Sequence, residues 1–513
     1  MENKFKKYAA ALGAAFMIII LTMIVRPFIR YSTLRQNRLS ETTDVKTGRG
    51  DIYDLNGNLI ATDTTLYDVH LDCCMIQNQE EWSIKSRELA QRLAMILPHR
   101  TAPQWCEYLQ TGRRNWKRFL PIVKNVAHNM ADTLCKLPLL KEGRMSGCIC
   151  APKQVRYYPY SDLARRTIGV CNRHNGKSTF GIEHSYDSDL KTYDIRTTLL
   201  MDHQMAADSI LKSVVSNDED IAGGCMALME VKTGALLAIA NCHRFDDGRI
   251  GEYFNYFLEY SYEPGPVAQT MTLTAALSDR IIKSLDCETC TSVAAIQDIA
   301  MKYADTQEYF IKWFEHFCGN NKYFSLTEMR DLYLPSQNCI DKSTFQSICA
   351  GYSYKVCPLH IMTFYNIIAN GGKRIRPTLI TKMTSETEGT RWLYPKQTDE
   401  NIVSEEVADT ITEILSKNIE LETFECLSVI LAGRFGASRQ VIPVKLRGDS
   451  TDPYHDSEGR CQYTRTFVGF YPADEPEYTL ICVFVNKPSH RSHLEFTSPA
   501  VAVKGMIKAL IQN

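Results

Sequence analysis

The N-terminal end of the chain carries an uncharged apolar run from Tyr8 to Val25. At about 1.5 Å per residue, a run of this length is sufficient to cross the hydrocarbon core of a bilayer as a helix. Lysines precede the run, arginines follow it, and no small-residue cleavage pattern ends it. The pattern therefore predicts a short tail over residues 1–7 and an uncleaved transmembrane signal-anchor helix over residues 8–26.

The pattern changes after the apolar run to short alternating and helical segments. Residues 48–61 alternate on both sides of Asn56-Gly57, which predicts two strands joined by a tight turn. Apolar residues recur at helical spacing over Trp82–Leu97 and again over Ala127–Leu137. We expect a mixed unit of strands and helices over residues 27–193.

A second unit is predicted over residues 194–513. It opens with helical spacing over His203–Val215 and a strand hairpin over Cys225–Asn241, which turns at Lys232-Thr-Gly234. Further segments predict helices over 268–277, 293–303 and 498–512, and strands over 466–471 and 477–485. Strands at both ends with helices between them indicate an α+β layered fold.

Composition narrows the possible partners. Lysine and arginine number 58 against 59 aspartate and glutamate, so the formal net charge is −1. Proteins that bind nucleic acid usually present a basic surface to the phosphates, so a nucleic-acid partner is not expected. Among 18 cysteines, only Cys287 and Cys290 have metal-like spacing, and no second pair completes a four-ligand set. We expect no metal and no cofactor.

Eight segments, in this order, resemble motifs of the class B penicillin-binding proteins, the transpeptidases of peptidoglycan synthesis. They are 49–61 (RGDIYDLNGNLIA), 156–164 (RYYPYSDLA), 180–190 (FGIEHSYDSDL), 194–204 (DIRTTLLMDHQ), 232–240 (KTGALLAIA), 262–265 (YEPG), 358–377 (PLHIM, then ANGG and a proline) and 467–472 (FVGFYP). Each segment alone is a weak signal. Together, the eight segments follow the family's order and cover essentially the whole chain, which makes the resemblance strong.

The resemblance implies an architecture and a setting. It implies a pedestal, or dimerisation-type, domain over 27–193 and a transpeptidase-like domain over 194–513, built on an antiparallel sheet flanked by helices. It also implies a single-pass protein of the bacterial cytoplasmic membrane, with its N-terminus in the cytoplasm and its body outside. The expected partners are other membrane proteins of cell-wall synthesis or division, and peptidoglycan stem peptides. The pedestal favours the division-specific branch.

The family's first catalytic motif is Ser-x-x-Lys, which places a lysine amine one helical turn from the nucleophilic serine. The slot after Tyr262-Glu-Pro-Gly265 contains Pro266 and Gln269 instead. Proline carries no nucleophile, and a glutamine amide is neither a base nor a cation. Proline nevertheless suits the first turn of a helix, so the helix is expected to persist without the chemistry.

The second and third motifs are altered as well. The family's Ser-x-Asn falls on Thr291 and Val293, and valine makes no amide hydrogen bond. The family's Lys-Thr-Gly falls on Arg434, Phe435 and Gly436. Arg434 retains the positive charge and Gly436 the flat strand, so both are candidates for binding a substrate carboxylate, whereas Phe435 is expected to fill the emptied cleft.

These replacements predict a protein without catalytic residues, used as a scaffold or regulator of peptidoglycan synthesis. Two alternatives remain open. The chain is an active transpeptidase if a displaced nucleophile such as Ser261, Thr270 or Ser438 has taken over. It is a non-covalent sensor of muropeptides or β-lactams if Arg434 binds a carboxylate.

Overall fold

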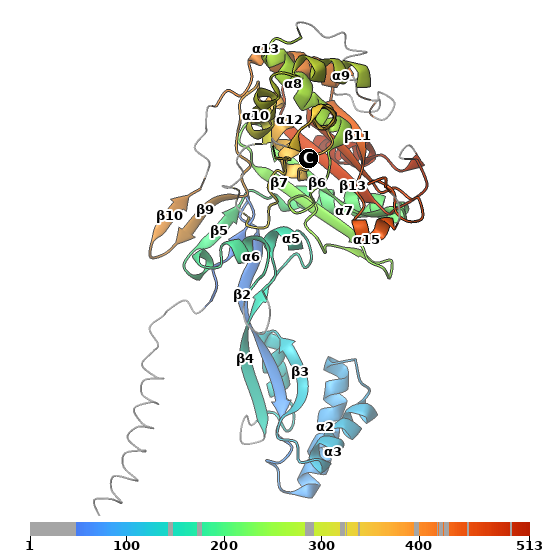
Figure 1. Cartoon of the computed structure of the whole chain (residues 1–513). Coiled ribbons are helices and arrows are strands. Elements are labelled where there is room, and N and C mark those ends of the chain that lie inside the picture. Colours follow the sequence, from blue (N-terminus) through green and yellow to red (C-terminus); the bar gives the residue numbers. More distant parts are fainter. Residues whose placement is uncertain are drawn as a thin grey trace, which may run out of the picture. The chain divides into compact units, whose positions relative to one another are not determined.

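The computed structural model describes residues 48–512, apart from 142–146, 172–176, 283–291, 319–323, 325, 337–338, 394–399, 418, 420–423, 425–429, 449–450 and 493–494 (Figure 1). Gly50–Asn513 forms one compact unit by its internal contacts. Thr291 and the Cys287–Cys290 pair lie outside the described residues.

The predicted membrane-spanning helix requires a correction. No helix among the described residues is both long enough and apolar enough to cross a bilayer, and residues 8–26 lie outside that part of the chain. The longest described helix, α2 (Gln79–Ile96), has 18 residues but carries six charged side chains, including Glu80, Glu81 and Lys85. The fold-class prediction is therefore corrected to an α+β protein without an assigned transmembrane helix.

One sheet combines strands from the N-terminal part of the described chain with β9 and β10 from its second half. Its strands run in the order β10-β9-β5-β1-β2-β3, and β4 pairs with β2. The strands are β1 (Ile52–Tyr53), β2 (Leu59–Leu71), β3 (Leu120–Val126), β4 (Cys148–Tyr157), β5 (Asp194–Thr197), β9 (Ile380–Ser385) and β10 (Gly389–Trp392). The predicted strand–turn–strand at 48–61 is confirmed, with the turn between β1 and β2.

Helices α2, α3 (Ala102–Arg114) and α4 (His128–Cys135) cover the part of this sheet formed by β2, β3 and β4. Their core includes Trp82 and Trp105, both almost fully buried. Asn78 caps α2 by accepting hydrogen bonds from the backbone N–H groups of Glu80 and Glu81. The helices predicted at 82–97 and 127–137 are thus confirmed. Short helical turns follow in α5 (Arg165–Ile168), α6 (Gly181–Ser185) and η2 (Asp189–Lys191).

A buried ion pair joins three of the motifs near the start of this region. Arg156 on β4 donates from Nε to Glu183 on α6 at 2.7 Å and from Nη2 to the carbonyl of Gly50 at 2.8 Å. Nη1 reaches Asp63 at 3.1 Å. The Glu183 side chain is fully buried, and that of Arg156 is 5% exposed. The residues that resemble the family's pedestal motifs therefore hold one another in place.

The second sheet is antiparallel throughout, with strand order β11-β12-β13-β6-β7-β8. Its strands are β6 (Ile221–Glu230), β7 (Leu236–Arg244), β8 (Ile250–Gly251), β11 (Ala432–Arg439), β12 (Tyr463–Tyr471) and β13 (Tyr478–Asn486). The predicted hairpin at 225–241 and both predicted C-terminal strands are confirmed.

Helices cover both faces of this sheet (Figure 1). One face packs against α7 (Met201–Asn217) and α16 (Pro499–Gln512), and the other packs against α12 (Pro358–Ala369). Alternate residues of β13 enter the two cores, with Ile481 and Val483 on the α12 side and Leu480 and Cys482 on the α7 side. A strand buried on both faces reads as a continuous apolar run, which is the pattern over 477–485.

The remaining helices pack on α12, pack on one another or follow β11. They are η3 (Gly265–Ala268), α8 (Gln269–Ser278), α9 (Val293–Lys302), α10 (Gln307–Cys318), α11 (Lys342–Cys349), α13 (Glu405–Lys417) and α15 (Val444–Arg447). The helices predicted at 268–277 and 293–303 are confirmed as α8 and α9. The observed architecture is the α+β, two-region arrangement that the sequence predicts, with an antiparallel sheet flanked by helices.

Candidate functional site

A cavity of about 570 Å³ lies where α8, α9, α11 and β11 meet. Its walls come from segments that are far apart in the sequence. The residues that line it are Gln269, Val293, Ile296, Gln297, Ser343, Gln346, Ser347, Ala350, Tyr352, Ala437, Arg439, Tyr454 and Tyr463. Because Gln269 and Val293 are both predicted motif positions, the structure brings the first two altered motifs to one cavity.

The turn that carries Pro266 is held by close backbone packing. Gly265 has φ +59° and donates its N–H to the carbonyl of Gly351 at 2.8 Å. A Cβ on Gly265 would lie 2.8 Å from the Cβ of Ser438 on β11, so glycine is required by both conformation and space. Pro266 follows within the 3₁₀ turn η3, which leads into α8. The predicted helix start is therefore retained, and Pro266, at the position that the resemblance assigns to the nucleophile, lies in its first turn.

Gln269 connects the first and third motif positions. Its side chain is 7% exposed. Its Oε1 accepts a hydrogen bond from Nη2 of Arg434 at 2.7 Å, and its Nε2 donates to the carbonyl of Ala350 at 3.5 Å. The residue in the lysine slot thus binds the residue that carries the charge of the third motif.

Strand β11 places the third motif beside η3. Gly436 pairs with Thr466 on β12, and a Cβ on Gly436 would lie 3.0 Å from the backbone nitrogen of Val267 and 3.3 Å from the Cβ of Pro266. Gly436 therefore lets the strand lie directly against the turn that contains Pro266. This contact explains the glycine without any ligand.

Two expectations for the third motif differ from the structure. Arg434 is bonded to Gln269 and is absent from the cavity lining, where Arg439 is the cation instead. Phe435 was expected to fill the cleft, but it packs against the core on the α7 and α16 side of the sheet, opposite Phe467 in register. Adjacent residues of a strand point to opposite faces, and Arg434 occupies the α8 side.

The hydroxyls considered as displaced nucleophiles are engaged or distant. Thr270 is 2% exposed, and its Oγ1 lies 3.0 Å from the hydroxyl of Tyr365. Ser438 is 1% exposed and accepts a hydrogen bond from Nε2 of Gln440 at 2.9 Å. Ser261 does not line the cavity, and no lysine is among the described residues that do. None of these three hydroxyls is paired with a general base.

The cavity also contains groups that the sequence reasoning did not identify. Ser343 and Ser347 lie one turn apart on α11, and Tyr352, Tyr454 and Tyr463 form an aromatic side. The spacing of Ser343 and Ser347 is a signal that they share a helix face, whereas nothing local in the sequence brings the three tyrosines together.

Glu263 supports this aromatic side from within the protein. It is 4% exposed and accepts from the Tyr454 hydroxyl and from the Ser353 backbone N–H, both at 3.1 Å. Burial raises the pKa of Glu263, and these two donors oppose the shift. Glu263 therefore positions Tyr454, and its two oxygens are already used as acceptors.

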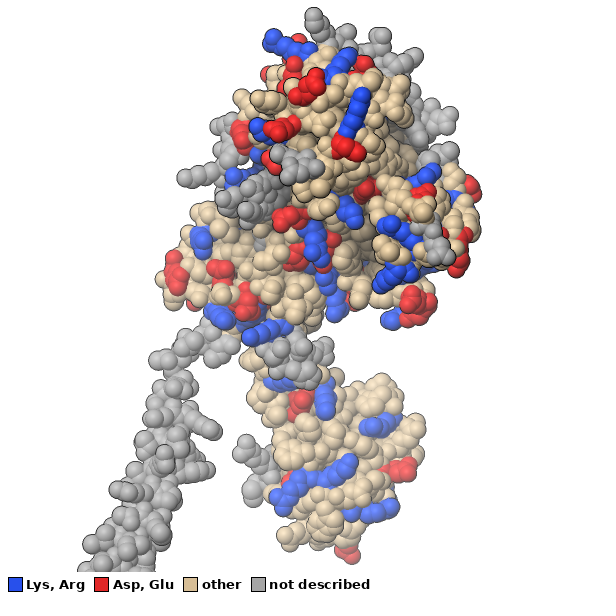
Figure 2. Space-filling view, in the orientation of Figure 1, with Lys and Arg blue, Asp and Glu red and all other residues tan. Residues whose placement is uncertain are grey.

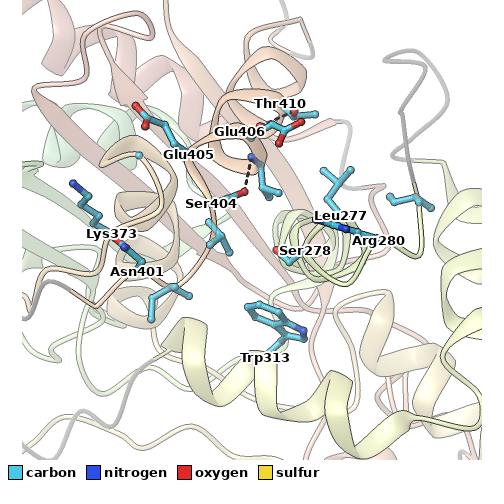
Figure 3. Close-up of a pocket in the computed structure, with 15 residues that line it drawn as sticks. Leu277, Ser278, Arg280, Trp313, Lys373, Asn401, Ser404, Glu405, Glu406 and Thr410 are labelled. Atoms are coloured by element: carbon cyan, nitrogen blue, oxygen red, sulfur yellow. Dashed lines mark hydrogen bonds between the residues drawn. The ribbon is translucent and has the colours of Figure 1, made fainter.

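A second, larger cavity of about 920 Å³ lies between the end of α8, α10 and the start of α13 (Figure 3). Trp313, Arg280 and Lys373 line it together with Glu405 and Glu406. It contains none of the altered motif positions, so the smaller cavity is the candidate site. Basic and acidic side chains are interspersed over the face of the molecule in Figure 2, which agrees with the near-zero net charge.

Comparison with known families gives two matches along the chain. Residues 44–204 match the penicillin-binding protein dimerisation domain, and residues 307–502 match the penicillin-binding protein transpeptidase domain. The second match begins after Pro266, Gln269 and Val293, so the segment with the first two altered motifs lies outside it.

Curated relatives and solved structures agree with these matches. The chain is 23% identical to penicillin-binding protein PbpB of Mycobacterium tuberculosis over 88% of this chain and 76% of that protein. It is 22% identical to PbpB of Mycolicibacterium smegmatis over 64% of this chain and 60% of that protein. The fold is similar to a peptidoglycan synthetase from Bifidobacterium adolescentis, with a TM-score of 0.62 and 17% identity over 90% of this chain and 95% of that one. Penicillin binding protein 3 from Mycobacterium tuberculosis, complexed with aztreonam, gives the same TM-score with 16% identity and the same coverage.

Proposed function

Because this chain belongs to the penicillin-binding proteins, with a dimerisation domain followed by a transpeptidase domain, we propose that it is a catalytically inactive member. It is a class B-like protein of peptidoglycan synthesis and cell division, and within that process we propose a role as scaffold or regulator. The observation that carries the proposal is the hydrogen bond between Arg434 and Gln269 beside Pro266. Of the three residues that we assign to the catalytic positions, Gln269 and Arg434 bind each other. The third, Pro266, carries no nucleophile.

The chemistry of acyl transfer explains why this matters. Loss of a serine nucleophile together with its base reduces turnover by about 10⁶-fold in serine hydrolases. Serine acyl-transfer enzymes also use the nucleophile's own backbone N–H to bind the oxyanion, and proline has no N–H. Pro266 therefore lacks both the attacking oxygen and one donor for the intermediate.

Covalent labelling tests the proposal. The purified protein is incubated with a fluorescent penicillin and analysed by denaturing gel and intact mass, beside a class B protein that has an intact Ser-x-x-Lys motif. We expect no adduct on this chain and complete labelling of the control. An adduct on any serine or threonine of this chain would refute inactivity, and peptide mapping would then identify the nucleophile.

We place the body on the outer side of the cytoplasmic membrane, where peptidoglycan is assembled. Proteolysis of intact spheroplasts tests this location, since an added protease should digest the body while a cytoplasmic marker stays whole. A body that survives until the cells are lysed would contradict the assignment.

We also propose that the pedestal binds other division-stage synthesis proteins. Ile84 and Met95 on α2, and Trp116 and Phe119 after α3, are each more than half exposed, which is costly unless a partner covers them. The test is a two-hybrid assay against the cell's intact division-stage synthases, with Trp116→Ala and Phe119→Ala expected to abolish a signal that Val501→Ala retains. An unchanged signal in the pedestal variants would reject this surface.

A second candidate function, non-covalent binding of a muropeptide, is favoured by the open cavity beside Gln269. Its cation is Arg439, with the hydroxyl of Tyr454 on the same wall. Calorimetry with a peptide ending in D-Ala-D-Ala distinguishes two anchors. Loss of binding in Arg439→Ala would support binding in the cavity. Loss of binding only in Arg434→Ala would support Arg434 as the carboxylate anchor, as the sequence predicts. Absence of heat with the unmodified protein would exclude the sensor.

A further inference from the structure

Three cysteines of the dimerisation domain lie together at the end of α4. Cys135 is the last residue of α4, Cys148 is the first residue of β4, and Cys150 follows two positions later. Cys148 and Cys150 pair with Leu71 and Val69 of β2. Residues two apart on a strand share a face, so both thiols lie on the same side of β4.

Two of the three thiols are in contact, and the three differ in exposure. Sγ of Cys135 lies 3.6 Å from Sγ of Cys148. Cys150 is near enough to the Cys135 thiol for each to shift the pKa of the other. Cys148 is buried, Cys135 is half-buried and Cys150 is exposed. Exposure thus increases from Cys148 through Cys135 to Cys150. All three are thiols in this structure.

We propose that this cluster is an oxidation site, in which Cys135 and Cys148 become a disulfide and Cys150 receives it from an external disulfide donor. The donor is a thiol–disulfide oxidoreductase or a small disulfide such as oxidised glutathione. The inference rests on the thiol geometry alone and is independent of the proposed loss of transpeptidase activity.

The exchange proceeds in three balanced steps. The Cys150 thiolate attacks the donor disulfide, which forms a mixed disulfide and releases one donor thiol. Cys135 then attacks the Cys150 sulfur and releases the second donor thiol. Cys148 finally attacks Cys135, and Cys150 returns to the thiol form. Overall, two cysteines are oxidised and one donor disulfide is reduced to two thiols.

The geometry requires only a small movement. Sulfur atoms in a disulfide are about 2.05 Å apart, so the Cys135 and Cys148 sulfurs have to approach by roughly 1.5 Å. Rotation about the Cα–Cβ bonds can supply much of that distance. A metal is a poorer occupant, because the described residues contain no group of three His, Cys, Asp or Glu side chains arranged to hold one.

The environment of the thiols predicts a slow reaction with the donor disulfide and a final disulfide that is hard to reduce. Burial raises the pKa of Cys135 and of Cys150 to about 11, and proximity to the neighbouring thiol adds to each shift. At neutral pH, roughly 10⁻⁴ of such a thiol is thiolate, so uncatalysed exchange is slow. A thiol with a high pKa is also a poor leaving group, so the completed disulfide resists reduction.

The disulfide would connect the C-terminal end of α4 to the start of β4. That strand pairs with β2 along its whole length, from Cys148 to Tyr157. The bond would therefore attach α4 to the sheet that carries it, and we expect the oxidised protein to melt at a higher temperature than the reduced protein.

Peptide mapping of the full-length protein is the direct test. The reduced protein is equilibrated with oxidised glutathione, alkylated and digested with trypsin, which leaves Cys135 on peptide 125–136 and both other cysteines on peptide 145–153. We expect the two peptides to be crosslinked, with fragmentation placing the bond on Cys148 and the alkyl group on Cys150. Fully alkylated peptides, or a final bond to Cys150, would overturn the proposal.

Three variants test the order of the steps. Cys148→Ser should accumulate the Cys135–Cys150 disulfide, and Cys135→Ser should stop at a glutathione adduct on Cys150. Cys150→Ser should still form the final disulfide, but about tenfold more slowly. Cys339→Ser, at another exposed cysteine, is the matched control and should change nothing. An unchanged rate in Cys150→Ser would remove Cys150 from the mechanism, whatever the other variants do.

Discussion

The contact between Arg434 and Gln269 can be tested by changing the charge at position 269. Gln269 is 7% exposed, and its Oε1 accepts from Arg434 at 2.7 Å. In Gln269→Lys, an ammonium replaces the acceptor and faces the guanidinium. In Gln269→Glu, a carboxylate takes the same position and gains a charge-assisted hydrogen bond.

The size of the effect follows from the separation of the charges. Two unit charges about 4 Å apart interact by about 1 kcal/mol in water and by about 4 kcal/mol at an effective dielectric constant of 20. The interaction is repulsive in the lysine variant and attractive in the glutamate variant. Even at the weaker limit, the two variants should differ by about 2 kcal/mol in free energy of unfolding.

Thermal unfolding followed by differential scanning fluorimetry is a suitable assay. We expect Gln269→Glu to melt several degrees above Gln269→Lys, with the natural protein between them or close to the glutamate variant. In an Arg434→Met background this difference should disappear or reverse. Equal melting temperatures of the two variants, or a difference that survives in Arg434→Met, would refute the contact on which the proposed inactivity rests.

Three further predictions concern stability. Arg156→Met should destabilise the protein by about 3–5 kcal/mol, because it leaves the fully buried Glu183 carboxylate without its cation, as measured by chemical denaturation. Burial lowers the pKa of His360 to about 4, below its ordinary 6.5, so the unfolded chain binds the proton more tightly. Stability from this group should therefore be present above pH 6.5 and fall by about 3 kcal/mol as pH drops towards 4, as seen in melting curves across that range. Gly436→Ala should cost about 1–3 kcal/mol, because its Cβ would lie 3.0 Å from the backbone of η3, and thermal unfolding measures this loss.

Each of these predictions has a matched control. Lys85→Met breaks an exposed ion pair with Glu81 and should cost under about 1 kcal/mol, so an equal loss in both arginine and lysine variants would argue against the burial effect. His360→Asn keeps an acceptor for the Cys357 N–H, which now donates to Nδ1 at 3.1 Å, and should flatten the pH dependence. If stability depends on pH equally steeply in His360→Asn, other groups cause the pH dependence. In Gly251→Ala the nearest atom to the new Cβ would be a ring carbon of Phe245 at 3.6 Å, an ordinary contact, so this change should be nearly neutral. Equal losses in Gly251→Ala and Gly436→Ala would contradict the steric reasoning.

Local patterns determined much of the secondary structure. The alternation around Lys232-Thr-Gly234 predicted the β6–β7 hairpin, and the apolar run at 477–485 became β13, buried on both faces. These signals depend on the period of the element and on turn residues, which a few neighbouring positions encode. By contrast, α3 and β4 were not predicted, and both are polar along much of their length.

The altered motifs were also readable from the sequence, since Pro266, Gln269 and Val293 can be identified by their place in an ordered set of segments. The contacts that these residues make could not be predicted from the sequence. The Arg434–Gln269 bond joins residues 165 positions apart, and it depends on how closely Gly436 lets β11 approach η3. Likewise, only the packing of β11 showed that Phe435 joins the core on the α7 and α16 side and that Arg439 lines the cavity.

The sequence by itself thus indicated the family and the order of the elements, and it motivated the proposal that a serine and a lysine are missing from the catalytic positions, because each depends on residue identity and local spacing. Only the tertiary structure decided that Gln269 and Arg434 bind one another, that an open cavity persists beside them, and that Cys135 and Cys148 meet at the end of α4. Those outcomes depend on packing between segments far apart in the chain, where distances and burial, not spacing, set the chemistry.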